Sequence, residues 1–285
     1  MVNEERIKKV VEKFKDLPPL PDILFRVEEI ANDPDSSARD LSDIIALDQA
    51  LTLRVLNVIN SPYFGLGRKI SSISQATAYL GFKEVRNLVM ADVFKGIYSR
   101  PIKGYGLDGT KAWEHNAAVG ITARLLAKKF GKDVSEAAFT AGITHDVGKL
   151  VLSDFMLLSY DDVTALLNEG SMCLVDAERG VIGIDHAKVG ALVARHWRLP
   201  DELSNVIEFH HEPSRVEDPS PVLLAVYLAN EFCTMMGIGS GIGSPTAGSE
   251  VDGDILEYFG IRKQGMEEYT YLIREELAKA QNLIG

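Results

Sequence analysis

The stretch AGITHDVGKLVL, residues 141–152, decides how the rest of the chain is interpreted. It is apolar and helical in character, yet it places His145 and Asp146 side by side. Neighbouring positions on a helix lie about 100° apart, so both side chains can converge on one ion just off the helix surface. An isolated buried carboxylate is costly, and a cation would stabilise it. The alternative is a surface turn of a core helix, and for this pair alone both interpretations stay open.

Composition limits the class of protein. The chain has 285 residues, of which 46% are hydrophobic, enough for one large domain or two small ones with a substantial core. Only Cys173 and Cys233 are present, which excludes a disulfide framework and a thiolate zinc site. No apolar run approaches the roughly 20 residues that span a membrane, and the opening MVNEERIKKVVEKF lacks the apolar core of a signal peptide. These features predict a cytoplasmic protein without a membrane segment.

The charge of the chain is negative and uneven. Net charge is −11, and residues 1–100 hold 14 Lys and Arg against 14 Asp and Glu. Residues 101–285 hold 16 Lys and Arg against 27 Asp and Glu, and therefore carry the whole excess of negative charge. An acidic surface repels phosphate backbones, so general nucleic-acid binding is not expected. A pocket with bound cations can still accept a phosphate-containing small ligand.

Helix signals are abundant and strand signals are scarce, which predicts an all-α fold. Residues 22–31 carry apolar side chains on one helical face, and Ser37, Asp48 and Ser72 are suited to cap the helices that follow. The Gly-rich segment SRPIKGYGLDG, residues 99–109, is expected to divide the chain into halves 1–100 and 101–285. Residues 237–254, rich in Gly and Ser, are expected to form a flexible loop, and residues 264–284 an amphipathic closing helix.

All six histidines lie in the second half: His115, His145, His186, His196, His210 and His211. A single histidine is more often a surface or hydrogen-bonded core residue, and His196, which lies off the His186 face, is expected to be one. The adjacent pair His210–His211, taken alone, also favours a structural role. Taken together, H…HD…H…HH on successive helices is much harder to explain without a metal. These nitrogen and oxygen donors suit one or two divalent ions of Fe, Mn, Ni or Zn.

The chain resembles two related families. Its second half resembles the HD superfamily of metal-dependent phosphohydrolases, above all the HD-GYP branch, which cleaves cyclic dinucleotides. Its first half resembles the HDOD family, the HD-related output domain of bacterial signalling. That likeness is carried by the segments LPPLPDIL, DPDSSARDLSDIIALDQALTLRVLNVINSPYFG and KISSISQATAYLGFKEVRNLV. It extends from about Leu17 to at least His211.

The resemblance implies an N-terminal helical bundle packed against an HD-like helical bundle. HDOD proteins are thought to be non-enzymatic output or scaffold modules that act on other signalling proteins, and many have lost the metal ligands. Here the ligand positions of the HD-GYP type correspond to His115, His145, Asp146, His186, His210 and His211. Lys149 falls where HD-GYP proteins keep a lysine that faces the substrate phosphate.

Three departures from the HD-GYP pattern bear on catalysis. The last aspartate ligand is matched by Asn230, whose amide oxygen is neutral and therefore a weaker ligand. The GYP loop is absent, and HHEPSRVEDPS stands in its place. An acidic ligand one turn before the first histidine is replaced by Lys111, which argues against a third metal.

Two functions follow, and the first is favoured. The chain is expected to be a signalling output module that retains a metal site; the alternative is a phosphohydrolase acting on nucleotides or a cyclic dinucleotide. A sensor whose iron responds to oxygen is compatible with the ligands, but nothing in the sequence demands it. In the first half, LPPL and NSPYFG are packing motifs or, alternatively, line a partner groove with Tyr63 and Phe64 as exposed anchors.

Overall fold

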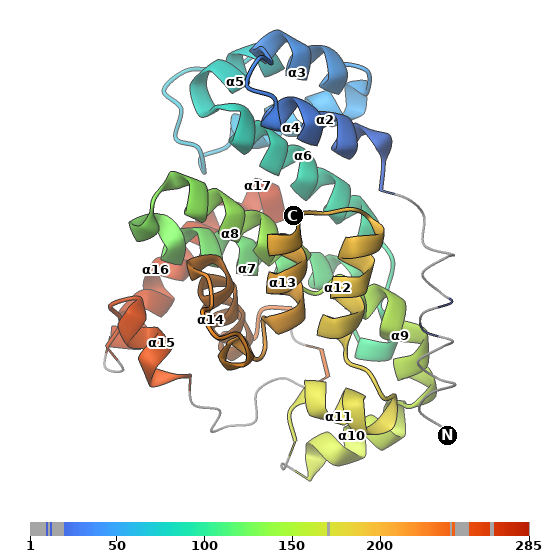
Figure 1. The fold of residues 1–285 in the computed structure, drawn as a ribbon. Helices are drawn as coiled ribbons and strands as arrows, with labels where there is room; N and C mark the ends of the chain where they lie inside the picture. The colour runs from blue at the N-terminus through green and yellow to red at the C-terminus, as the bar shows by residue number, and fades with distance from the viewer. Residues whose placement is uncertain are drawn as a thin grey trace.

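The computed structural model describes residues 10, 12, 20–169, 172–239, 241–242, 251–262 and 265–284. Within these ranges the chain is helical, with one isolated bridge between Ile102 and Leu107 and no strand, which confirms the all-α class. The first helices, at the top of Figure 1, are α2 (Asp22–Asn32), α3 (Ala38–Ile45), α4 (Gln49–Ile59), α5 (Ile73–Leu80) and α6 (Phe82–Ile97).

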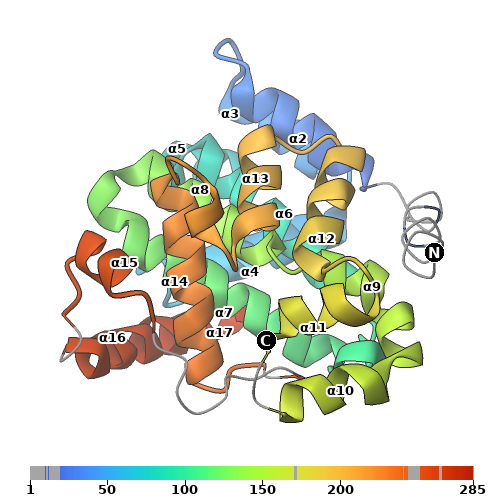
Figure 2. The same ribbon diagram turned by 60° about the horizontal axis from the view of Figure 1, so that its bottom comes forward.

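The second part of the chain contains the remaining helices. They are α7 (Gly109–Ala127), α8 (Lys132–Thr144), α9 (Gly148–Leu158), α10 (Tyr160–Asn168), α11 (Leu174–Val181), α12 (His186–His196), α13 (Asp201–Phe209), α14 (Pro221–Met235), α15 (Gly253–Tyr258), α16 (Met266–Lys279) and α17 (Gln281–Ile284). Helix α14 packs on α7, and α10 and α11 lie side by side at the lower end of the molecule (Figures 1 and 2).

Short polar side chains begin the helices of the first bundle, as the sequence predicts. The Ser37 hydroxyl accepts a hydrogen bond from the Asp40 amide, and the Asp40 carboxylate accepts one from the Ser37 backbone N–H, which completes a capping box. Asp48 caps α4 and Ser72 caps α5 in the same manner. These caps fix where each helix begins. The apolar faces of the helices then point into one shared core.

Helices α7 and α8 cross where two glycines meet. A Cβ added at Gly142 of α8 would lie 2.5 Å from the Cα of Gly120 on α7, so only hydrogen fits between the backbones. The close crossing brings the segment after α8 next to the N-terminal half of α7. As a result, the ring centroids of His115 and His145 are 5.4 Å apart.

Helices α9 and α12 also approach each other through glycines. A Cβ on Gly148, the first residue of α9, would lie 1.9 Å from the His186 carbonyl oxygen and 2.5 Å from the Gly190 nitrogen. Side chains larger than hydrogen are therefore excluded at this contact. The contact places the start of α12, which carries His186, directly against the turn that carries Asp146.

The two parts of the chain share buried polar contacts and a continuous apolar core. Arg124 of α7 donates to Glu84 of α6 at 2.8 Å, and both side chains are about nine-tenths buried. The Tyr63 hydroxyl lies 3.4 Å from Arg124 and, like the Phe64 ring, Tyr63 is half-buried against the core. This packing of both rings favours a structural role for NSPYFG. Whether the chain divides near residue 100 into separate domains stays a prediction.

Some expectations concern residues outside the described ranges. The N-terminal stretch before Leu20, apart from Val10 and Glu12, lies outside them, as do residue 240 and residues 243–250 of the expected flexible loop. The segment 99–109 is described, and it folds back on α9 with Gly104 and Tyr105 buried. Over the described part of the chain, every helix is too short or too polar to cross a membrane.

Candidate metal centre

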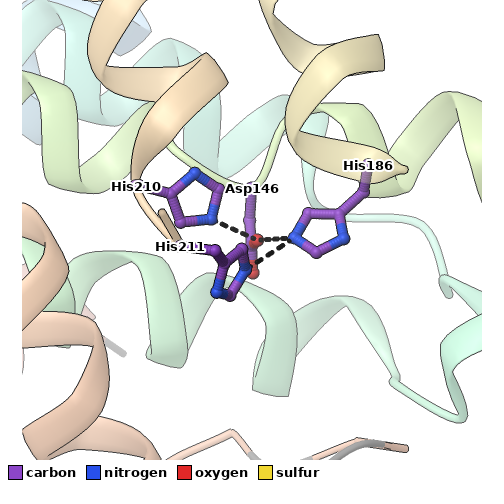
Figure 3. Close-up of side chains that lie close together, drawn as sticks. All are labelled: Asp146, His186, His210 and His211. Carbon is purple, nitrogen blue, oxygen red and sulfur yellow. Dashed lines mark hydrogen bonds and ion pairs between the residues drawn. The ribbon is translucent and has the colours of Figure 1, made fainter. Parts of the chain in front are cut away.

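Four segments deliver the candidate ligands to one point around Asp146. His115 lies on α7, His145 and Asp146 lie between α8 and α9, His186 begins α12, and His210 and His211 follow α13. Figure 3 shows His186 of α12, and His210 and His211 of the segment after α13, gathered around the Asp146 carboxylate. The structure thus brings together six side chains that the sequence spacing singled out.

The backbone at His145 and Asp146 differs from the expected continuous helix. Helix α8 ends at Thr144, His145 is its C-cap residue, and α9 begins only at Gly148. The expectation that residues 141–152 form one helix is therefore wrong. The break has a physical reason: Gly148 must approach α12 closely, and the turn redirects the chain so that it does. Both side chains still point to the same side.

Four of the five histidines at the centre, all but His211, are oriented by a hydrogen bond on the ring nitrogen that faces away from Asp146. In the tautomer protonated at Nδ1, His145 donates to the Gly142 carbonyl at 2.7 Å and His210 to the Ile207 carbonyl at 2.8 Å. His115 Nδ1 lies 3.1 Å from the Ile238 carbonyl. The Nε2 lone pairs of His145 and His210 are then free to face the carboxylate. Histidines that ligate a metal are held in this way.

His186 is held by a carboxylate that the sequence did not reveal. Glu178 of α11 accepts hydrogen bonds from both the backbone nitrogen and Nδ1 of His186, each at 2.8 Å. Its other oxygen accepts the Tyr105 hydroxyl at 2.6 Å, and Glu178 is fully buried. A carboxylate behind a histidine makes the histidine a stronger ligand and fixes its orientation. No local signal marks Glu178, because this contact joins two different helices.

Three buried atoms at the centre lack a hydrogen-bond partner within the described ranges. They are Nε2 of His145, Nε2 of His210 and Oδ1 of Asp146. Buried polar atoms without partners cost free energy and are rare in folded proteins. Both imidazole nitrogens face the Asp146 carboxylate, His210 Nε2 at 3.8 Å from Oδ1 and His145 Nε2 at 3.5 Å from Oδ2, as donor atoms around cations would. The residues present therefore fit a divalent metal.

The donor atoms form two groups that share Asp146. In the first, one ligand atom each from Asp146, His186, His210 and His211 lies within 4.8 Å of the others. In the second, His115, His145 and Asp146 meet the same criterion. We call them site A and site B. Figure 3 draws the residues of site A.

The two carboxylate oxygens of Asp146 face different sites. Oδ1 lies 3.4 Å from His186 Nε2 and 3.8 Å from His210 Nε2, both in site A. Oδ2 lies 3.5 Å from His145 Nε2 and 3.8 Å from His115 Nε2, both in site B. Asp146 is thus the link between the two groups of imidazoles.

Burial keeps three of the imidazoles neutral. It lowers the pKa of His145 to about 4. It also holds the pKa of His210 well below the usual value, and the pKa of His211 likewise, helped in each case by a neighbouring histidine. A neutral imidazole is the form that binds a metal ion.

Asp146 stays ionised although it is buried. Burial alone would raise the pKa of this carboxyl, but the Lys149 ammonium, 2.5 Å from Oδ2, together with His145 and His186 holds the pKa well below its usual range. Burial alone would lower the pKa of His186, but the Glu178 and Asp146 carboxylates together raise it to about 9. Since a ligating imidazole must give up its proton, metal binding at His186 would release one.

A cavity of about 730 Å³ opens over the centre. Asp146, His115, His211, Lys149 and Asn230 line its floor, and the Tyr98 and Tyr105 rings and apolar side chains of α10 and α11 line other parts. His145, His186 and His210, which are 0% exposed, lie behind these residues. A small ligand in this cavity can therefore reach the carboxylate and the lysine together.

The other residues predicted from sequence are placed as follows. Asn230 of α14 is buried, and its Oδ1 lies 3.1 Å from His115 Nε2. Lys111 is exposed near the start of α7 and does not line the cavity. His196 is exposed at the end of α12, away from the other five histidines, as expected.

Comparison with known proteins gives the family. The family model of the HDOD domain matches residues 17–213. A relative from Treponema pallidum is 27% identical over 232 residues, which are 78% of this chain and 43% of the relative, so the chain spans less than half the length of that curated protein.

Solved structures agree with the fold. An HDOD domain protein with unknown function from Geobacter sulfurreducens is 25% identical, with a TM-score of 0.75 over 96% of this chain and 98% of that one. A protein from Shewanella amazonensis, titled "Putative phosphohydrolase", is 23% identical, with a TM-score of 0.73 over 96% of each chain, and shows the fold alone. The family match covers most of the sequence, and this chain belongs to the HDOD domain family.

Proposed function

We propose that this chain is an output or scaffold module of bacterial signalling whose folded state contains a bound divalent metal. The family membership supports the signalling role. The observation that carries the metal is the set of buried atoms without hydrogen-bond partners on His145, His210 and Asp146, which bound cations would satisfy. Its partners are other signalling proteins, which it binds without general affinity for nucleic acid.

In this proposal the metal supports structure. A bound ion supplies a positive charge that offsets the buried carboxylate and orders the histidines around it. Because Asp146, His186, His210 and His211 come from α12 and the segments after α8 and α13, one ion among them would tie these parts of the chain together. The binding free energy then adds to the free energy of unfolding.

Metal analysis of protein purified without chelator tests this proposal. We expect at least one equivalent of Fe, Mn, Ni or Zn per chain, detected by plasma mass spectrometry. Removal of the ion with a chelator should lower the melting temperature, because binding to the folded state alone stabilises by about 4 kcal/mol when free ion is 1,000 times Kd. Protein without any metal, and with the same melting temperature before and after chelation, would refute the proposal.

A second function, a metal-dependent phosphohydrolase, is favoured by the cavity over the centre. Lys149 lies on the cavity floor beside Asp146, where its ammonium can bind and orient a phosphate group. The Tyr98 and Tyr105 rings can pack against the rest of the ligand. When bound, a metal would supply Lewis acidity to this chemistry. The neutral Asn230 and the absent GYP loop stand against it.

Hydrolysis assays distinguish the two functions. A phosphohydrolase should release p-nitrophenol from bis-(p-nitrophenyl) phosphate, or linear product from cyclic dinucleotides, when Mn or Fe is added. The Lys149→Met variant should then lose about 10²-fold in kcat, since it lacks the charge that stabilises the phosphoryl group. A scaffold module gives no release above buffer with either protein. If no product is released with any of these metals and substrates, the phosphohydrolase function is refuted.

A further inference from the structure

We propose that the centre is unequal: site A binds one ion tightly, whereas site B is occupied internally by the Lys149 ammonium and binds a second ion only weakly. This inference rests on the proposed metal binding and specifies how the same centre is filled. The main observation behind it is that the two carboxylate oxygens of Asp146 have different contacts. The described contacts of the two sites differ in three respects.

The first difference is the state of the carboxylate. Oδ1 of Asp146, which faces site A, is buried and has no hydrogen-bond partner among the described residues. Oδ2, which faces site B, already accepts the Lys149 ammonium at 2.5 Å. At Oδ1 the nearest described group is Nε2 of His186, 3.4 Å away, which is itself a ligand of site A, so a cation entering site A displaces no outside charge. A cation entering site B must displace Lys149 or share its oxygen.

The second difference is the donor set. Site A offers three imidazoles and a carboxylate oxygen, which is a complete tetrahedral set for an ion such as zinc. Site B offers only His115 and His145 besides Asp146, and the fourth donor in reach is the Asn230 amide oxygen. That oxygen is neutral and lies 3.1 Å from His115 Nε2, at hydrogen-bond distance. An amide is a weaker ligand than a carboxylate for a divalent ion.

The third difference is charge. Asp146 is the only carboxylate that both groups contain, so a second divalent ion would share one negative charge with the first. Lys149, whose side chain is 13% exposed, adds a further positive charge beside it. Like charges a few ångströms apart in a partly buried site repel strongly. Site A is also supported by Glu178 behind His186, and site B has no corresponding carboxylate among the described contacts.

Two alanine variants give a matched test of the inequality. His145 and His186 are both 0% exposed, and each contributes one imidazole to one site only. After dialysis against a weak metal buffer, wild type is expected to keep one ion per chain. His145→Ala should keep that ion, and His186→Ala should lose it. His186→Gln replaces His186→Ala if circular dichroism shows that the alanine variant does not fold.

Two further variants should open site B. Asn230→Asp supplies the missing charged ligand, and Lys149→Met removes the internal cation. Each is expected to strengthen the second binding step at least ~10-fold in calorimetric titration with Mn²⁺, the scale typical of changes around a metal site. Lys149→Arg keeps the positive charge and is the control, so it should titrate like wild type.

The outcomes separate this inference from the function on which it rests. Wild-type protein without any ion would overturn both. Two equally tight ions in wild type, or loss of the tight ion in His145→Ala as well, would overturn the inference and leave metal binding intact. An unchanged second step in both Asn230→Asp and Lys149→Met would also overturn it, since those residues would then not limit site B.

Discussion

Replacing Asp146 with alanine is expected to strip the protein of every tightly bound ion. Asp146 is the one residue common to both groups of donors, and it supplies their only carboxylate. Without it, the remaining donors are neutral imidazoles and an amide, beside an ammonium on Lys149 that has lost its partner. Metal content should fall below a tenth of an equivalent, as measured by plasma mass spectrometry.

The same variant should no longer respond to chelation. In wild type, loss of about 4 kcal/mol of binding free energy corresponds to about 10 °C in melting temperature for a chain of this size. For Asp146→Ala, the melting curves with and without chelator should coincide. Asp161→Ala, which removes an exposed carboxylate in the first turn of α10, is the control and should behave like wild type. A full equivalent of metal in Asp146→Ala would contradict this assignment of the ligands.

Replacing Gly148 with alanine is expected to destabilise the protein strongly and to weaken metal binding. The added Cβ would lie 1.9 Å from the His186 carbonyl oxygen and 2.5 Å from the Gly190 nitrogen, which are backbone atoms that cannot rotate away. Overpacking of a rigid contact costs about 3 kcal/mol or more. Helices α9 and α12 must separate, and His186 then moves away from Asp146. Metal affinity should fall by ~10- to 100-fold, the range seen when the support of a ligand is disturbed.

Gly180→Ala is the matched control for the Gly148 variant. Gly180 lies in α11, and a Cβ there would meet nothing within 4 Å. Alanine favours the helix, so this variant should be more stable than wild type by about 0.5–1 kcal/mol in urea unfolding. A Gly148→Ala protein with wild-type stability and metal content would show that the contact between α9 and α12 does not position the centre.

The helices of the first bundle could be predicted because their signals are local. Ser37 and Asp48 cap amides three residues ahead of them, so the chemistry is visible in a window of four residues. The same holds for Asp185, which caps α12 and thereby places His186 at its first position. The histidine spacing, together with the family resemblance, was sufficient to single out the residues that converge on Asp146.

The remaining features depend on contacts between distant segments. The break between α8 and α9 contains no proline, and His145 keeps helical dihedral angles, so the sequence contains no strong stop signal there. Glu178 stands in the polar stretch DAERG, where a charge usually faces solvent, and only the packing of α11 against α12 reveals its contact with His186. The division of the Asp146 oxygens between two sites is likewise a property of three-dimensional geometry.

The first and last ligands of site A along the chain, Asp146 and His211, are separated by 65 positions. Bringing them together requires closing a long loop, and that entropic cost is recovered only when the intervening helices have packed. A nascent or nicked polypeptide whose helices are not all in place therefore offers incomplete coordination. Only molecules that are completely folded and uncleaved would therefore retain the ion.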